Sequence, residues 1–499
     1  MSKIVEIKQN NFSGGVSDDI RKNDGTQFAI TKHFDIFSNP QRLTPYRSLE
    51  TDTNDGSTST GMKQYFVRDF VYSSTSAKLY GLGQNGSGQT KIVYKDDATT
   101  GNWTLPSSSE GNGAVKNGCF VEYKDYLWGF QGTNQIFKWG LLSGTPSITN
   151  TVSTVGSTIT SVANGVIASD ANLYLAYNNV IVRVNTSGTV TDSAKTVPTN
   201  FKITSLTNYG NYLAISCSPV SNYNGVSKVF LWNLSSDLFQ ETIDWGEGEL
   251  RVLETVEGYL VGVTDRYLNN SVGAGKGSMI VQIYAGGATQ IVKEIFTQAL
   301  VGKSIPTSKA LRNNRLFWAA KIMTNSSGTE YHEGLWSFGR KNGQYPWALT
   351  LDIIDDNVDT DGIEAFGIAG NYFFISHSND GSIDKTNDSA VYTFTSVYET
   401  QILDFGAPDS DKRVNTLKVS FAPIISGQSL TAKIKTDDDS NWTTIGTFNT
   451  VGETSKTFTE IESTGAAFPG GREIKFRLES TGGLEVTAWS SRADILLNP

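Results

Sequence analysis

The chain has 499 residues, which is about three times the length of a typical domain, so two or more cores or one large repeat array are expected. Its 49 glycines, 25 phenylalanines and 20 tyrosines favour strands and turns, and an all-β protein is predicted. The net charge of −9 argues against a surface that binds a phosphate backbone, which needs clustered Lys and Arg. Only Cys119 and Cys217 are present, both in apolar runs, so buried free thiols are expected and no disulfide framework.

The N-terminal sequence MSKIVEIKQNNF lacks the apolar segment of a secretory signal. No stretch of about 18 consecutive apolar residues occurs, so no membrane-spanning helix is expected. These features predict a soluble protein that is made in a cytosol.

Residues 1–60 are predicted to form an extended N-terminal arm. Gly14 and Gly15 allow the backbone to bend, and Pro40 and Pro45 keep the later part extended. We expect this arm to dock either on the repeat body of its own chain or on a neighbouring subunit, with a disordered tail as the alternative. The expected interaction residues are Phe12, Gly14, Gly15, Asp18, Arg21, Pro40, Pro45, Tyr46 and Arg47.

A dense aliphatic and aromatic run recurs along residues 61–406. The run occurs as AKLYGLG, DYLWGF, NLYLAY, NYLAIS, GYLVGV, NRLFWAA and NYFFIS, and successive copies lie 40 to 57 residues apart. Each run is followed by a second strand-like segment: KIVYK, QIFKWG, NVIVRVN, KVFLWNL, SMIVQIY, GLWSFG and AVYTFT. The pairs predict antiparallel meanders joined by Gly- and Asn-containing turns.

One four-stranded meander cannot bury both of its faces, so the meanders must stack on one another. The period suits a blade of a β-propeller, and about seven blades over residues 61–406 are predicted. Two or three stacked sandwiches are the alternative. From residue 407 the sequence changes to strict alternation, which predicts a C-terminal β-sandwich over 407–499. Its expected inner-face residues are Leu417, Val419, Phe421, Ile474, Phe476 and Leu478.

Catalytic signatures are absent from the sequence. His33, His332 and His377 are the only histidines and have no metal-ligand spacing, and no nucleophile elbow, zinc-protease or phosphate-loop motif occurs. Asn357, Asp359 and Asp361 follow the alternate spacing of a calcium loop, but the position that needs a Glu is Ile368, so a solvated acidic loop is favoured. We therefore expect no enzyme activity, cofactor or metal.

The N-terminal arm nevertheless carries a recognisable pattern. An F-x-G-G-V-S sequence is followed by a polar stretch, an Asn-Pro turn and an ending rich in Pro and Arg, before the repeats begin. This pattern resembles the N-terminus of bacteriophage tail tubular or nozzle proteins. The residues that carry the resemblance are Phe12, Gly14, Gly15, Val16, Ser17, Asn39, Pro40, Leu43, Pro45 and Arg47.

The resemblance implies a structural protein of a virion, assembled in the bacterial host cytoplasm. Members of that family form propeller-based rings at the end of short tails, through which the genome passes. The expected partners are copies of the chain in a ring and other tail or neck proteins. An acidic lumen would let phage DNA pass transiently without specific binding. The chain is shorter than the large nozzle proteins and has an additional sandwich, so nozzle, neck, baseplate and fibre attachment stay open as positions.

Two other classes of function stay open. One is a carbohydrate-binding or carbohydrate-cleaving propeller, in which Trp103, Trp442 and Trp489 would stack on sugar rings. The other is a tail protein that binds a receptor on the host cell.

Overall fold

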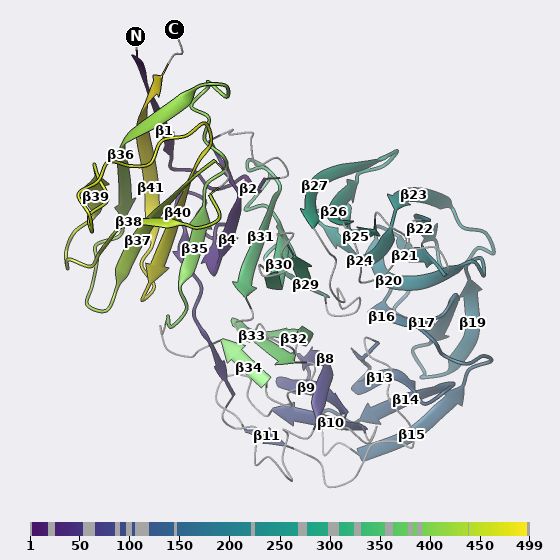
Figure 1. Cartoon of the computed structure of the whole chain (residues 1–499). Coiled ribbons are helices and arrows are strands. Elements are labelled where there is room, and N and C mark those ends of the chain that lie inside the picture. The colour runs from purple at the N-terminus through teal and green to yellow at the C-terminus, as the bar shows by residue number, and fades with distance from the viewer. Residues whose placement is uncertain are drawn as a thin grey trace. The chain divides into compact units, whose positions relative to one another are not determined.

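The computed structural model contains strands as its only regular elements within the residues that it describes, which confirms the all-β prediction (Figure 1). The described residues are 2–17, 25–52, 65–84, 90–95, 102–104, 119–143, 147–220, 225–267, 277–297, 309–323, 331–354, 363–377, 383–386, 392–437 and 439–496. No helix in these ranges has the length and apolar character needed to cross a membrane.

Most described strands belong to four-stranded antiparallel sheets, the arrangement that the repeats predict. Six of these sheets each consist of four consecutive strands. The first three are β8 (Phe66–Ser73), β9 (Lys78–Gln84), β10 (Thr90–Lys95) and β11 (Trp103–Thr104); β12 (Val121–Tyr123), β13 (Tyr126–Gln131), β14 (Gln135–Gly140) and β15 (Ser147–Thr154); and β16 (Val162–Ile167), β17 (Leu173–Tyr177), β18 (Val180–Val184) and β19 (Val190–Thr196). The other three are β20 (Phe201–Tyr209), β21 (Tyr212–Pro219), β22 (Val226–Trp232) and β23 (Glu241–Glu247); β24 (Glu249–Val256), β25 (Tyr259–Tyr267), β26 (Gly277–Tyr284) and β27 (Thr289–Thr297); and β28 (Lys309–Arg312), β29 (Arg315–Met323), β30 (Tyr331–Gly339) and β31 (Ala348–Ile354).

The next sheet is completed by a strand from the other end of the chain. It contains β32 (Ile363–Ala369), β33 (Tyr372–His377) and β34 (Ile383–Thr386), and its fourth strand is β7 (Leu49–Thr51). The partner of β33 is therefore residues 383–386 and not the AVYTFT segment, whose described part leads into β35 (Ser396–Glu399). Local pattern could not identify this partner, because IDKT is short and largely polar.

Contacts divide the chain into two units, which we call the repeat unit (Leu49–Gly334 and Asp355–Thr386) and the terminal unit (Met1–Ser48, Leu335–Ile354 and Asn387–Pro499). This division differs from the expected boundaries at 60 and 406. The reason is that the first residues of the chain pair with strands near its C-terminus, which sequence proximity does not reveal.

In the repeat unit, the first strand of each sheet contacts the first strand of the next. The contacts run through β8, β12, β16, β20, β24, β28 and β32, and β32 contacts β8 again. Apolar side chains fill the spaces between successive sheets. A core that includes Phe70, Trp103 and Phe374, for example, joins the first sheet to the sheet of β32. The second strands are nearly continuous apolar runs because they are buried on both faces, as in β17, where all five residues are buried.

The terminal unit contains two larger sheets. One has the order β1 (Ser2–Gln9), β41 (Val486–Leu496), β36 (Asp411–Phe421) and β39 (Ser455–Phe458). The other has the order β38 (Thr443–Phe448), β37 (Ser429–Thr436), β40 (Ile474–Thr481), β35 and β4 (Ile30–Lys32). The terminal unit also contains two short two-stranded sheets: β2 (Gly15–Val16) with β3 (Gln27–Phe28), and β5 (Phe34–Asp35) with β6 (Thr44–Pro45).

Burial alternates strictly along β37 and β40, as their sequences predict. All six expected inner-face residues are at most 3% exposed. Aromatic rings from the two sheets meet, with Phe421 of β36 4.9 Å from Phe448 of β38 and Phe476 of β40 6.2 Å from Trp489 of β41.

Candidate functional site

The N-terminal segment is part of the core of the terminal unit. Phe12 is fully buried, and its ring meets the edge of the Tyr398 ring at 5.5 Å. The Tyr398 hydroxyl donates to Gln9 Oε1 at 2.6 Å and accepts from Trp489 Nε1 at 2.9 Å. Burial raises the pKa of Tyr398 well above its usual value, so this hydroxyl stays neutral. Phe12 is thus an anchor within its own chain.

The two adjacent glycines allow a close approach to a neighbouring strand. Gly15 has a φ of +68°, and a Cβ there would lie 2.7 Å from the backbone nitrogen and oxygen of Leu349 on β31. At Gly14 a Cβ would lie 2.6 Å from side-chain atoms of Thr26 and Gln27. The expected bend is present, and its purpose is dense packing inside the terminal unit.

The remaining expected interaction residues have different surroundings. Pro40 and Pro45 are buried, and the Pro40 carbonyl accepts a hydrogen bond from the Phe12 amide at 2.7 Å. Tyr46 is half-buried and Arg47 is exposed. Asp18 and Arg21 lie outside the described residues. The segment therefore packs on strands of its own chain, as one alternative expected: β1 pairs with β41, Gly15 lies against β31 of the sixth four-stranded sheet, and β7 pairs with β34.

Groups with the potential for chemistry are dispersed or saturated. His33 is buried and stacked on Phe394, and His377 Nε2 lies 3.2 Å from Asp384 Oδ2. His332 lies in β30, and its side chain is outside the described residues, as are Asn357, Asp359 and Asp361. Within the described part of the chain, no group of three or more His, Cys, Asp or Glu could hold a metal ion.

The two cysteines are buried and free, as expected. Burial raises the pKa of Cys119 to about 12 and that of Cys217 well above its usual value. Both thiols are therefore protonated at neutral pH, so neither is a ready nucleophile.

A network of buried charges links the fourth and fifth sheets of the repeat unit. Arg251 binds Glu249 at 2.8 Å and Asp265 at 2.7 Å, and Lys202 binds Glu249 at 2.6 Å. Burial alone would raise the pKa of Glu249, but Arg251 and Lys202 outweigh it and hold that pKa below its usual value. The carboxylate is ionised and paired, which suits a structural tie better than a general acid.

Lys309 makes a second tie between first strands. From β28, its Nζ donates to Ser205 Oγ at 3.0 Å and Leu206 O at 2.9 Å, both on β20, and lies 3.1 Å from Glu254 on β24. Because its side chain is 8% exposed and its donors are used, it is a cross-link and not a free amine.

The tryptophans that would stack on sugars are largely covered. Trp103 is 7% exposed and donates to Asp52 at 2.9 Å, and Trp489 is 2% exposed. Trp442 is half-buried, and Arg477 lies 4.5 Å from the centre of its ring. Trp103 and Trp489 therefore belong to cores, as tryptophans in β proteins often do.

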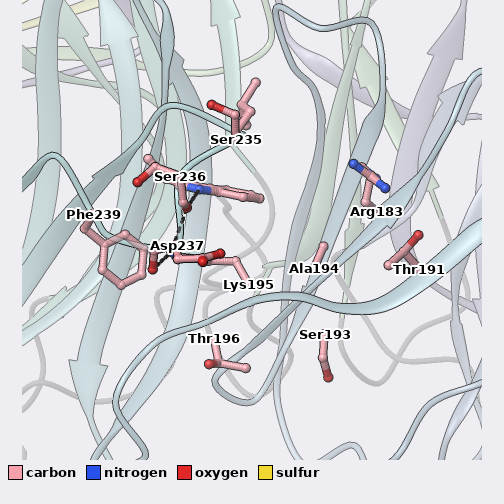
Figure 2. Close-up of a pocket in the computed structure, with 12 residues that line it drawn as sticks. Arg183, Thr191, Ser193, Ala194, Lys195, Thr196, Ser235, Ser236, Asp237 and Phe239 are labelled. Carbon is pink, nitrogen blue, oxygen red and sulfur yellow. Dashed lines mark hydrogen bonds between the residues drawn. The ribbon is translucent and has the colours of Figure 1, made fainter.

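A pocket of 510 Å³ lies in the repeat unit between the β18–β19 hairpin and the segment that joins β22 to β23 (Figure 2). Arg183 and Thr191 stand on one side, and Ser235, Ser236 and Asp237 stand on the other. The sequence predicts the strands of this pocket but not the pocket. Its lining residues come from two neighbouring sheets, and the β18–β19 ladder contains a register shift between Ile181 and Arg183 that has no clear sequence signal.

Comparisons with known proteins were also made. No protein-family model matches the sequence. No curated protein matches it either. Among solved structures, an inactive virginiamycin B lyase from Staphylococcus aureus with quinupristin is similar at 10% identity and a TM-score of 0.42, over 68% of this chain and 97% of the lyase. The Neurospora crassa Pan2 WD40 domain is similar at 8% identity and a TM-score of 0.39, over 65% and 90% of the two chains. YCF48 bound to D1 peptide is similar at 9% identity and a TM-score of 0.41, over 66% of this chain and 93% of YCF48. No function is transferred to this chain from similarities at this level.

Proposed function

We infer that the four-stranded sheets from β8 to β34, with β7, are seven blades of one closed β-propeller, and that the two larger sheets of the terminal unit form a β-sandwich. The cyclic contacts between first strands support the closure. So does the insertion of β7 beside β34, which joins an early segment of the chain to the last sheet. The rings that meet between the sheets of β36 and β38 support the sandwich.

We further propose that the protein is a structural component of a bacteriophage tail, present in the virion and acting by assembly. The observation that carries this proposal is the architectural role of the residues that resemble tail tubular or nozzle proteins. Phe12 and Pro40 are buried together beside Tyr398, and Gly15 is buried against Leu349 on β31, so the pattern reflects a constraint on the fold.

Because Phe12, Gly15 and Pro40 are buried, the contact between subunits must use other residues. β1 is an edge strand, paired only with β41 in its sheet among the described residues. It exposes 66% of Ile4, an unusual apolar side chain for an open edge. An edge of this kind is suited to pairing with a strand of a second copy.

Light scattering after size-exclusion chromatography, together with negative-stain imaging, tests this proposal. We expect the wild-type chain to form rings and Ile4→Glu to weaken them, because a charge would be placed in the contact. Val451→Glu is a matched control, since Val451 is also 66% exposed but lies outside β1. A wild-type chain that stays monomeric and is missing from purified virions would contradict the proposal.

A further inference from the structure

We propose that the pocket between the β18–β19 hairpin and the β22–β23 segment binds an acidic saccharide, with its carboxylate on Arg183. This site goes beyond the assembly role and does not depend on it. At 510 Å³, the pocket falls in the range of about 300–1,000 Å³ that is usual for small-molecule sites.

Arg183 supplies the charge for the ligand. Arg183 lines the pocket, and no ion pair of Arg183 is found within the described residues; because its Nε atom is buried, a ligand can reach only the terminal nitrogens. A guanidinium can bind a carboxylate through two parallel hydrogen bonds from its terminal nitrogens. In Figure 2 the Arg183 side chain stands across the pocket from Ser235. An anionic group in the pocket would therefore supply the ion-pair partner that Arg183 does not have within the described residues.

Lys195 does not compete with Arg183 for that anion. Its Nζ donates to the carbonyl oxygens of Ser236, at 3.1 Å, and Asp237. It also lies 4.5 Å from the centre of the Phe239 ring and 5.5 Å from that of Trp232. These contacts fix the β22–β23 segment against β19 and form a rigid wall of the site.

The other lining groups select for a ligand rich in hydroxyl groups. Side chains that both donate and accept hydrogen bonds come from Thr191, Ser193, Thr196, Ser235 and Ser236, and Asp237 adds an acceptor. Lys195 covers the Phe239 and Trp232 rings, and Trp232 is only 4% exposed, so little aromatic surface is left for a nucleobase or a lipid. A sugar ring with a carboxylate fits this combination of one cation and many hydroxyls.

Inorganic anions are too small to use the whole site. The pocket has space for many water molecules, each of which takes about 30 Å³ in the liquid, and Asp237 would repel a second negative charge. A ligand with its carboxylate beside Arg183 and its hydroxyl groups beside Asp237 would pair with the guanidinium and donate hydrogen bonds to the Asp237 carboxylate.

Isothermal titration calorimetry with the full chain tests the proposal. The probes are an α-1,4-linked trisaccharide of one terminal galacturonic acid and two galactose units, the neutral galactose trisaccharide of the same linkage, and inorganic sulfate. We expect the acidic trisaccharide to bind at least tenfold more tightly than the neutral one or sulfate. Arg183→Met, which keeps the volume of the side chain, should abolish this preference. Arg472→Met removes the same charge from an exposed position and should leave the preference intact.

Arg183→Lys provides a second readout, because it keeps the charge but cannot form the two parallel hydrogen bonds. We expect an affinity between those of the wild type and Arg183→Met, with melting temperatures showing that each variant is folded. Equal binding of the acidic and neutral trisaccharides, binding of neither, or sulfate binding as tight as the acidic trisaccharide would overturn the proposal.

Discussion

His33 shows how one buried side chain sets a dependence on pH. Burial, assisted by the nearby charge of Lys32, lowers the pKa of His33 to about 3, against about 6.5 in the unfolded chain. The unfolded state therefore takes up a proton first as the pH falls, and stability is lost between about pH 6.5 and pH 3. At about pH 4.5 this loss is roughly 2–3 kcal/mol.

His33→Asn tests this dependence. Asn tolerates the left-handed backbone of this position, where φ is 58°, and does not titrate. Urea unfolding at pH 7.5 and 4.5 should show a smaller loss of stability for the variant than for the wild type. An equal loss in both proteins would show that His33 does not control the dependence.

Gly15 occupies a position where any side chain would collide with the backbone of a neighbouring strand. Gly15→Ala combines a strained φ of +68° with a Cβ 2.7 Å from the Leu349 backbone, and we expect a loss of more than about 2 kcal/mol in the free energy of unfolding. Gly452→Ala is the control, because Gly452 has a φ of +88° but open space around its Cβ. It should lose about 1 kcal/mol. Similar losses measured by urea unfolding would exclude the close approach as the cause.

Among elements, β7 has the clearest single function, because the residue that follows it, Asp52, lies in the core of the repeat unit. Asp52 binds the Lys95 ammonium and the Trp103 indole, and both Asp52 and Lys95 are at most 1% exposed. Asp52→Ala should cost about 3–5 kcal/mol, since it leaves a buried charge without a partner.

Asp52→Leu combined with Lys95→Met removes both charges. We expect the double variant to be more stable than Asp52→Leu alone, because neither charge is then left uncompensated. The four proteins of the double-mutant cycle can be compared by thermal unfolding at neutral pH. Additive effects of the two substitutions would mean that the pair does not hold β7 in place.

At the scale of the whole molecule, the two units are each built from separated parts of the chain. The fragment 407–499 lacks β1, β35 and β4, so strands β41 and β40 would lose partners. We expect this fragment to be unfolded or aggregated, with a poorly dispersed amide NMR spectrum. Residues 387–499 joined by a Gly/Ser linker to residues 2–48 should give a better-dispersed spectrum. A well-folded 407–499 fragment would contradict this view of the terminal unit.

The sequence by itself determined those features that depend on local periodicity. The apolar runs mark the second strands β9, β13, β17, β21, β25, β29 and β33, because a strand buried on both faces needs consecutive apolar residues. Alternation in β37 and β40 identified the buried faces. The apolar surroundings of Cys119 and Cys217 likewise indicated buried thiols.

Only the tertiary structure decided which distant segments pair. β7 joins β34, β1 joins β41 and β4 joins β35, although each pair is separated by more than 300 residues. Backbone hydrogen bonds in a sheet are formed by every residue type except proline, which has no N–H to donate, so they leave little trace in the sequence. The pocket at Arg183 has the same origin, because its lining combines a hairpin of one sheet with a loop of the next sheet.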